Sequence, residues 1–308
     1  MIDTRIKFRH LHTFLEVARQ KSVIRAAEIL NVSQPAVTKT IRELEEALGV
    51  TVFERDGRGI RITRYGEVFL KHAGASLAAL RQGIDSVSHE LFTTAPPVQV
   101  GALPTVSNRI MPRAITLFLA ETTGARVKIV TGDNAVLMEQ LRLGELDLVV
   151  GRLAPPEKMT GLSFEHLYSE QIVFVTRTRH PLLDPRQSIF ERLKDFTVLM
   201  PTRSSIIRRS VEQFLIANGV ANLPIQVETV SDAFGRAFVS SSDAVWIISA
   251  GVVAEDIKHG LLATLPIDTS ETKGPVGLTI AADAVPSAPL SILMQTIRQA
   301  AMEIMPSS

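Results

Sequence analysis

Hydrophobic residues between positions 33 and 48 recur at the spacing of an α-helix that has two different faces. One face repeats Val37, Ile41, Leu44 and Leu48 at intervals of four, three and four residues. The opposite face carries small, hydroxyl, amide and cationic side chains, which suit contact with base edges and phosphates. This polar set consists of Ser33, Gln34, Pro35, Ala36, Thr38, Lys39 and Arg42. The pattern predicts a helix that lies in a DNA groove.

The first turn and the polar face suggest roles for individual side chains. We expect the Ser33 hydroxyl to cap the first turn, and Pro35 fits that turn because a first-turn N–H has no helical partner. Gln34 and Thr38 are expected to contact bases, while the two cations mainly hold the helix against phosphates.

Two shorter helices are predicted before this one. The first begins near residue 8, and the second spans residues 23–30, with Ser22 as its cap and two adjacent alanines that allow close crossing. Asn31 then tolerates the left-handed conformation that a sharp turn between helices requires. This order is typical of a helix-turn-helix, in which the last helix contacts DNA.

A short hairpin is predicted directly after the third helix. Residues 50–53 and 60–63 are expected to form two strands around a glycine-rich tip. Such a wing can place Arg55, Arg58 or Arg61 against phosphate or in the minor groove. The alternative is a solvated hairpin with ordinary surface arginines.

The segment from residue 65 to about 92 contains no proline and predicts one long helix. Apolar residues recur there at intervals of three and four, which favours a coiled-coil seam between two chains. The seam residues are Leu70, Leu77, Leu80, Ile84, Val87 and Leu91. The alternative is packing of the same face against the chain's own body. Pro96 and Pro97 end the helix and predict a hinge at residues 94–97.

Strand and helix patterns alternate from residue 98 onward, which predicts an α/β body with parallel sheets covered by helices. Expected strands are 98–103, 126–130, 146–151, 171–176, 197–200, 225–230, 244–248 and 275–281, and expected helices are 108–120, 135–143, 204–218, 231–240 and 290–304. We therefore predict a DNA-binding head at 1–65, a linker helix at 66–93 and a two-lobed body at 98–308.

Parallel sheets bind ligands beyond the carboxyl ends of their strands, so a binding cleft can be predicted where two lobes face each other. The candidate ligand-binding residues at such positions are Thr105, Ser107, Thr131, Pro201, Thr202, Arg203, Ser204, Arg236 and Ser249. Hydroxyls and free N–H groups at helix starts favour a small organic anion, and Arg203, Arg208 and Arg236 would add charge pairing. The alternative for each Ser or Thr is an ordinary helix cap. Arg236 lies among apolar neighbours and needs an anion, either a protein carboxylate such as Asp232 or a ligand.

The composition restricts the class of protein. Residues 1–64 hold 12 Lys or Arg against 8 Asp or Glu, while the remaining 244 hold 21 against 24, so only the head is expected to meet a polyanion. No apolar run reaches the ~18 residues of a membrane span, and residues 1–5 do not lead into a signal peptide. The absence of cysteine excludes disulfides and thiolate metal sites and suits a reducing cytoplasm.

The chain resembles the LysR-type transcriptional regulators. The matching stretches are 14–27, 33–37, 41–45, 48–49, 53–55 and 62–66. Thr38 stands where the family more often has Ser, and Ile24 with Arg25 replaces a commoner polar pair. Arg25 thereby adds a predicted phosphate contact.

The resemblance implies a winged helix-turn-helix, a dimerising linker helix and a periplasmic-binding-protein-like body. It also implies that the chain returns to its first lobe, which gives lobe one as about 98–169 and 274–305 and lobe two as about 170–273. Dimers, tetramers and a contact with RNA polymerase are further implications. Within the family, stretches 5–11, 98–111, 146–152 and 230–236 are similar to activators of protocatechuate catabolism, which implies a ring-cleavage polycarboxylate such as β-carboxymuconate as effector.

The sequence carries no signature of an enzyme. No metal-ligand spacing, nucleophile elbow, phosphate loop or dinucleotide fingerprint is present, so we expect no catalysis, no cofactor and no metal. His10 and His12 form a close pair that we expect on the surface. The alternative functions are a solute-binding protein for organic anions and a repressor of the same family with a different effector.

Overall fold

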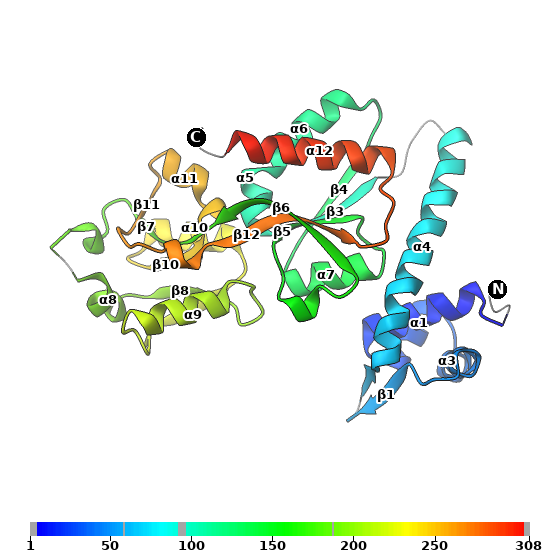
Figure 1. The fold of residues 1–308 in the computed structure, drawn as a ribbon. Helices are drawn as coiled ribbons and strands as arrows, with labels where there is room; N and C mark the ends of the chain where they lie inside the picture. The colour runs from blue at the N-terminus through cyan, green and yellow to red at the C-terminus, as the bar shows by residue number, and fades with distance from the viewer. Residues whose placement is uncertain (1–4, 58, 92–96, 187, 305–308) are drawn as a thin grey trace.

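The computed structural model describes residues 5–57, 59–91, 97–186 and 188–304, and shows a small head joined by one long helix to a two-lobed body (Figure 1). The head contains α1 (Phe8–Gln20), α2 (Val23–Leu30), α3 (Gln34–Leu48), β1 (Phe53–Asp56) and β2 (Gly59–Ile62). The three predicted helices are confirmed. The Ser22 hydroxyl accepts a hydrogen bond from the Arg25 N–H at 3.3 Å, and Asn31 ends α2 with a φ of 53°.

The predicted capping role of the Ser33 side chain is wrong. Ser33 occupies the N-cap position of α3, but its hydroxyl makes no capping hydrogen bond. Pro35 has no N–H to donate, and the Ala36 N–H already bonds to the Ser33 carbonyl at 3.0 Å. The hydroxyl therefore stays on the exposed start of α3.

The first strand of the wing starts at Phe53 and not at the predicted residue 50. The Glu45 carboxylate on α3 accepts hydrogen bonds from the N–H groups of Val52 at 2.8 Å and Phe53 at 3.4 Å. Val52 is fully buried, so residues 50–52 are tied to the helix rather than to a strand partner. The antiparallel register then pairs Phe53 with Ile62.

The long helix α4 (Arg64–Leu91) connects the head to the body. Leu77 is 8% exposed and Leu70 is partly buried, and both pack in the apolar cluster that fills the head. This half of the predicted seam therefore packs within its own chain, mainly against the head rather than against the body. Leu80 and Ile84 are 45% and 56% exposed. The side chains of Val87 and Leu91, and residues 94–96 of the predicted hinge, lie outside the described residues.

Lobe one contains a five-stranded sheet in the order β4-β3-β5-β12-β6. Its strands are β3 (Val98–Ala102), β4 (Val127–Thr131), β5 (Leu148–Arg152), β6 (Leu162–Glu170) and β12 (Gly274–Ala281). Helices α6 (Met111–Glu121) and α12 (Ala288–Glu303) pack together on one side, and α7 (Asn134–Arg142) covers the other (Figure 1). One helix had been expected at 108–120, but the chain forms α5 (Pro104–Arg109) and then α6, because Pro112 starts a new first turn.

Lobe two contains a second five-stranded sheet in the order β11-β7-β10-β8-β9. Its elements are β7 (Ile172–Arg177), α8 (Ile189–Arg192), β8 (Val198–Pro201), α9 (Arg208–Ala217), β9 (Gln226–Thr229), α10 (Asp232–Ser241), β10 (Val245–Ser249), α11 (Ala254–Lys258) and β11 (Leu262–Thr264). Short 3₁₀ turns lie at Pro156–Lys158, Pro181–Leu183, Leu193–Asp195, Ala250–Val252 and Ser270–Thr272. The chain enters this sheet between Glu170 and Ile172 and leaves it before Gly274.

The predicted parallel pairing is present in both sheets, between β3 and its two neighbours and between β8 and its two neighbours, but each sheet is mixed rather than wholly parallel. β12 runs antiparallel to both β5 and β6, and β7 runs antiparallel to β10 and β11. Strands β6 and β11 were not predicted. β7 follows β6 directly, and β12 follows β11 without a crossover helix between them. β7 and β12 therefore run in the reverse direction within their sheets.

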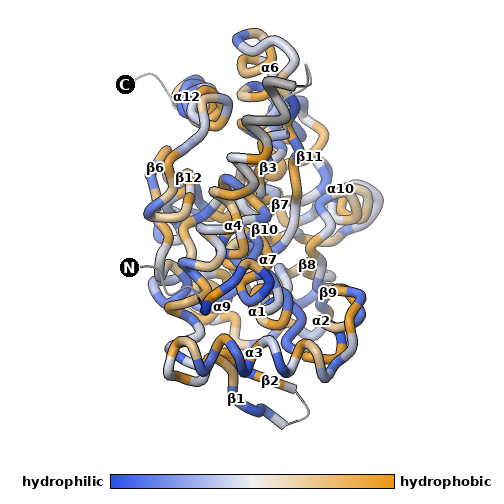
Figure 2. Tube along the Cα trace, turned by 90° about the vertical axis from the view of Figure 1, so that its right-hand side faces the viewer, coloured by the Kyte–Doolittle hydropathy of each residue, from blue (hydrophilic) through white to orange (hydrophobic). Residues whose placement is uncertain are grey.

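Each lobe has its own apolar core, and a third apolar cluster fills the head. Figure 2 places the wing strands β1 and β2 at one end of the molecule and α6 at the other. Among the described residues, no helix is both long and apolar enough to cross a membrane.

Candidate DNA interface and effector cleft

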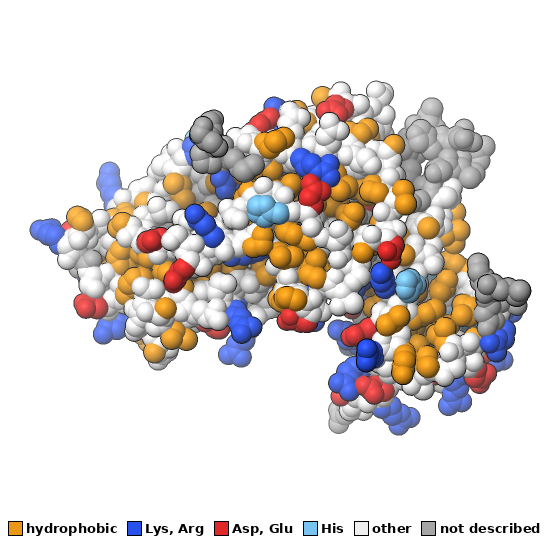
Figure 3. Space-filling view, in the orientation of Figure 1, with side chains coloured by type: hydrophobic (Ala, Val, Ile, Leu, Met, Phe, Trp, Pro, Cys, Tyr) orange, Lys and Arg blue, Asp and Glu red, His pale blue; other side chains and the backbone are white. Residues whose placement is uncertain are grey.

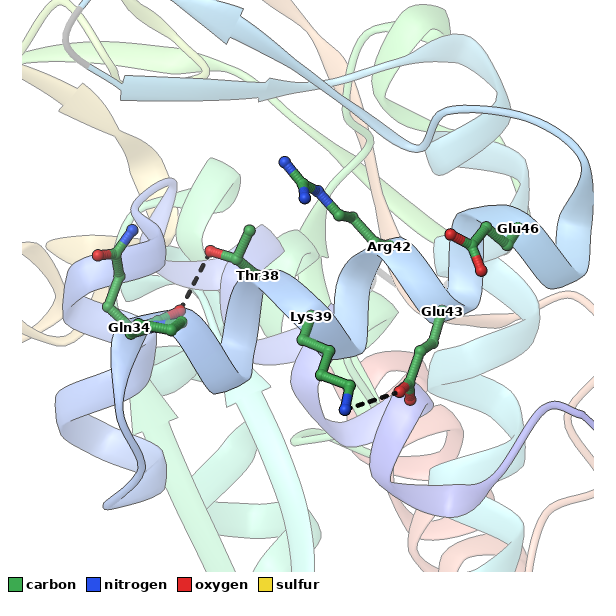
Figure 4. A pocket seen from close by; sticks show the side chains of 7 residues that line it. Gln34, Thr38, Lys39, Arg42, Glu43 and Glu46 are labelled. Carbon is green, nitrogen blue, oxygen red and sulfur yellow. Dashed lines mark hydrogen bonds and ion pairs between the residues drawn. The ribbon is translucent and has the colours of Figure 1, made fainter.

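The exposed face of α3 forms a shallow concave surface lined by seven residues. They are Gln34, Pro35, Thr38, Lys39, Arg42, Glu43 and Glu46. Figure 4 shows Gln34, Thr38, Arg42 and Glu46 in one row and Lys39 beside Glu43 in the next. Rows of this kind follow from the helix period, which places residues four apart on the same face. The structure thus brings together five of the predicted DNA contacts on one surface.

Two acidic residues on this surface were missed by the sequence analysis. Glu43 and Glu46 each lie four residues after a predicted cation, Lys39 and Arg42, and this spacing was the available signal. The Lys39 ammonium lies 4.0 Å from a Glu43 carboxylate oxygen. The surface is therefore not uniformly cationic, and Figure 3 shows the same mixture of blue and red around the lower rim of the head.

The Glu43 carboxylate ties α3 to α1. His10 Nε2 lies 3.2 Å from a Glu43 carboxylate oxygen, and the Arg9 guanidinium donates to the same oxygen at 2.8 Å. Hydrogen bonds from His10 and then Arg9 lower the pKa of Glu43. His10 is only 2% exposed, so its predicted surface position is wrong, whereas His12 is exposed. The other ring nitrogen of His10 accepts the Lys7 N–H at 3.2 Å, so both nitrogens of the buried ring have partners.

The other predicted DNA contacts lie around this surface. Arg25 on α2 and Arg55 on β1 are exposed. Arg61 on β2 is exposed as well, but its guanidinium forms an ion pair with Glu54 across the wing at 2.7 Å. Arg58 lies outside the described residues.

A cleft of about 460 Å³ lies between the two lobes. Its lining is Leu103, Pro104, Ser107, Thr131, Gly132, Asp133, Asn134 and Val136 from lobe one, and Pro201, Ser205, Ile206, Thr229, Val230, Ser231, Asp232, Trp246, Ile248 and Val252 from lobe two. The first turns of α7 and α10 open onto it. Of the nine predicted ligand contacts, Ser107, Thr131 and Pro201 line this space.

Two of the predicted contacts lie at the rim of the cleft. The Ser204 hydroxyl donates to the Asp133 carboxylate at 2.7 Å, which joins lobe two to lobe one. Thr202 and Ser204 share a hydrogen bond at 3.2 Å. Arg203, between them, is exposed and does not line the cleft.

Two others are buried behind the cleft. Ser249 is 5% exposed and Thr105 is 6% exposed. The Thr105 hydroxyl hydrogen-bonds to Glu170, at the point where the chain passes between lobes, and Arg109 lies 3.3 Å from the same carboxylate. Burial raises the pKa of Glu170, and the bonds from Thr105 and Arg109 oppose that rise. Thr105 therefore holds the connection between the lobes rather than lining the ligand space.

Arg236 pairs with protein carboxylates, which are one of the two kinds of anion expected for it, the other being a ligand. Its guanidinium lies 2.8 Å from Asp256 and 3.2 Å from Asp232. Burial opposes ionisation of Asp232, but hydrogen bonds from Asn108 and Arg236 outweigh it and lower the pKa of this carboxyl. Arg208 is likewise paired with Glu212 and Glu228.

The charge of the cleft differs from the sequence-based expectation. Within the described part of the chain, no Arg, Lys or His side chain lines the space, whereas Asp133 and Asp232 do. Asp133, Thr229 and Trp246 were missed as site residues. The signal for Asp133 and Thr229 was their place at or just beyond the carboxyl end of a strand, whereas Trp246 lies within β10, where Gly235 of α10 packs against its ring.

Comparison with known proteins follows the same division into head and body. The profile for the bacterial regulatory helix-turn-helix protein of the lysR family matches residues 8–67, and the LysR substrate binding domain matches residues 93–302. The transcriptional regulator PcaQ of Agrobacterium fabrum is 70% identical over 304 residues, which cover 99% of this chain and 98% of that protein. The uncharacterised regulator YdcI of Escherichia coli is 33% identical over 97% of both chains.

Solved structures of similar fold include two full-length regulators. A variant of OxyR from Pseudomonas aeruginosa superposes with a TM-score of 0.61 at 23% identity, over 96% of this chain and 94% of that one. CbnR complexed with its target DNA superposes with a TM-score of 0.53 at 23% identity, over 96% of this chain and 100% of that one. At this identity the likeness concerns the fold.

Proposed function

Because the chain belongs to the LysR family of DNA-binding transcriptional regulators, we propose that it activates aromatic-catabolism genes in response to a small organic carboxylate. The observation that carries this proposal is the presence of a DNA-suited α3 surface and an interlobe cleft in one chain. Similarity to activators of protocatechuate catabolism favours β-carboxymuconate or a related ring-cleavage product as effector. The cytoplasm, where DNA is accessible, is the proposed location.

The proposed effector would be held by helix starts and hydroxyls rather than by arginines. The first turns of α7 and α10 contribute Asn134, Val136, Ser231 and Asp232 to the cleft. The helix dipole at such starts favours an anion, although two N–H groups of α10, those of Ala233 and Phe234, already donate to protein side chains. The charge of Asp232 opposes anion binding less than that of Asp133, because Arg236 and Asn108 already pair with Asp232. Asp133 is the main repulsive group, which limits how closely a carboxylate approaches that side.

The proposed assembly is a dimer, or a tetramer of two dimers, that contacts an approximately palindromic operator with paired heads. Leu80 and Ile84 on α4 supply an exposed apolar stripe for self-association. Effector binding would close the lobes, change the placement of the heads, and so alter DNA bending and contact with RNA polymerase. The effector can shift this equilibrium only because it prefers one arrangement.

Transcription in vitro tests the proposal. An operator is first selected from random duplexes with the full-length chain, and RNA polymerase is then added with and without β-carboxymuconate. With the compound present, an activator raises the transcript yield above that of RNA polymerase alone. A repressor lowers the yield below that of polymerase alone when the compound is absent, and a solute-binding protein does not retain the duplex.

Salt dependence and thermal unfolding supply the controls. Operator affinity should fall steeply as salt rises, since bound phosphates release counterions. Effector binding should raise the unfolding temperature, while a monocarboxylate of similar ring-cleavage chemistry should do so less.

A further inference from the structure

The body of the protein contributes a leucine to the core of the DNA-binding head. Leu143, directly after α7, is 4% exposed and lies in the same apolar cluster as Phe14, Val52 and Leu77. Leu143 belongs to lobe one by sequence, and the other three belong to the head and to α4. The head is therefore docked on lobe one through buried apolar surface, beyond its covalent connection.

Two glycines set how closely α4 approaches the end of α7. A Cβ on Gly74 would overlap the Arg142 carbonyl, so a side chain there would force the two backbones apart. Gly144 has a φ of 70°, and a Cβ there would lie 2.9 Å from the Gly74 carbonyl oxygen and 3.2 Å from the Ala78 Cβ. This backbone contact fixes the two segments in one geometry.

Charged pairs lie around this contact. Arg19 on α1 lies 3.2 Å from Glu145, and Lys71 on α4 lies 2.9 Å from Asp283 of lobe one. Exposed pairs of this kind add little stability, but they favour one orientation of the head over others. The Lys71 stem also packs against Gly161 of lobe one.

The opposite end of α7 reaches the cleft. Asp133, Asn134 and Val136 line it, and Asp133 holds Ser204 of lobe two. A helix of nine residues spans about 14 Å at 1.5 Å per residue. Figure 1 shows α7 beneath the lobe-one sheet with its neighbour α4 alongside. One rigid element therefore runs from the ligand space to the joint with the head.

We propose that Gly74 and Gly144 are positioning residues that hold the DNA-binding head and lobe one as one unit, with α7 relaying the state of the cleft to the head. The joint itself does not depend on the identity of the effector. The relay rests on the proposed function, because it needs a ligand that alters the contact of Asp133 with lobe two.

The first experiment measures the joint without ligand or DNA. The chain contains no cysteine, so Glu28→Cys in the head and Glu121→Cys in lobe one allow two spin labels. The labelled full-length chain is diluted into unlabelled chain, so that each assembly carries one labelled copy. We expect one narrow distance distribution. A broad distribution in the otherwise unchanged protein overturns the proposal.

Gly74→Ala and Gly83→Ala form a matched pair on the same helix. Both raise helix propensity equally, but only the Gly74 methyl overlaps lobe one, since no atom of the described residues lies within 4 Å of a Cβ on Gly83. Gly74→Ala should shift or broaden the label distance, and Gly83→Ala should not. An unchanged distance in Gly74→Ala contradicts the joint.

The second experiment measures the relay on the selected operator, with β-carboxymuconate as probe. Coupled sites typically change affinity by ~5- to 150-fold, and we expect this factor to fall toward onefold in Gly74→Ala while the ligand-induced thermal shift persists. A full response in Gly74→Ala overturns the relay. If the unchanged protein shows no thermal shift, the effector assignment fails. The label distances still test the contact between the head and lobe one, because they are measured without ligand.

A second pair covers the case in which Gly74→Ala does not fold. Leu143→Ala removes the apolar contact without a clash, and Leu143→Met restores most of its volume. The alanine variant should lose the narrow distance and the methionine variant should regain it. Equal distances in both variants contradict the proposal.

Discussion

The Asp133 carboxylate accepts a hydrogen bond from the Ser204 hydroxyl at 2.7 Å, and this contact joins the two lobes at the rim of the cleft. Asp133 also lines the ligand space, while Ser204 does not. One residue therefore both stabilises lobe closure and repels an anionic ligand. Substitution of each partner should separate the two effects.

Ser204→Ala should weaken binding of β-carboxymuconate, because it removes the interlobe bond and keeps the repulsive charge. Loss of this solvent-exposed hydrogen bond, at about 1 kcal/mol, corresponds to a roughly fivefold weaker affinity. Asp133→Asn keeps an acceptor for Ser204 and removes the charge, so it should tighten binding. Calorimetric titration of both variants checks the signs, and a loss of affinity in Asp133→Asn would argue against an anionic effector.

Gln34→Ala should weaken binding to the selected operator by about 1–3 kcal/mol and leave non-specific binding nearly unchanged. Arg42→Ala should weaken both and reduce the salt slope by about one. Titration with operator and with scrambled duplex at several salt concentrations measures these effects. Equal losses on both duplexes for Gln34→Ala would make that residue a phosphate contact rather than a base contact.

Glu43→Gln should reduce the stability of the head at neutral pH. Hydrogen bonds from His10 and Arg9 hold the pKa of Glu43 below its ordinary value of 4.5. A lowered pKa in the folded state stabilises the fold above pH 4.5, and this contribution is lost as the pH falls through the folded-state pKa. Thermal unfolding between pH 3 and 7 should show the difference between variant and parent shrinking below about pH 4.5. A constant difference would contradict the assignment.

Leu80→Glu and Ile84→Glu should dissociate the protein into smaller species without unfolding it, because both side chains are exposed on α4. Leu77→Ala should instead destabilise the fold by about 2–5 kcal/mol, since it leaves a cavity in the head core. Ala75→Glu, exposed on another face of α4, is the control. Light scattering and denaturant unfolding distinguish the outcomes, and an unchanged mass in the first two variants would exclude this stripe as the dimer contact.

Most of the features that could be predicted for the head depend on residues that are close together in the sequence. The two faces of α3 follow from residues three and four apart, and Asn31 can adopt its turn without a distant partner. The Ser33 cap failed for an equally local reason, since Pro35 lacks the N–H that the cap would need. The start of β1 could not be predicted, because it depends on Glu45 reaching across to Val52.

The cleft was predictable only in outline. Ser107 and Thr131 follow strands, and the rule that ligands bind beyond strand ends placed them correctly at this edge. The same rule included Thr105, whose side chain turns to Glu170 instead. The proximity of Arg236 to Asp256 joins residues 20 apart through the packing of α10 and α11, which sequence spacing does not encode.

The sequence by itself determined the elements of this protein that rest on short-range periodicity: the DNA-facing helix, the turn before it, the long linker helix and the alternation of strands and helices. The tertiary structure alone decided which side chains meet. It reversed β7 and β12 within their sheets, paired two of the arginines expected at the ligand, Arg236 and Arg208, with protein carboxylates, and buried Leu143 of the body in the head. The physical reason is that helix and strand periods are set by neighbours along the chain, whereas contacts between distant segments are set by how their surfaces pack.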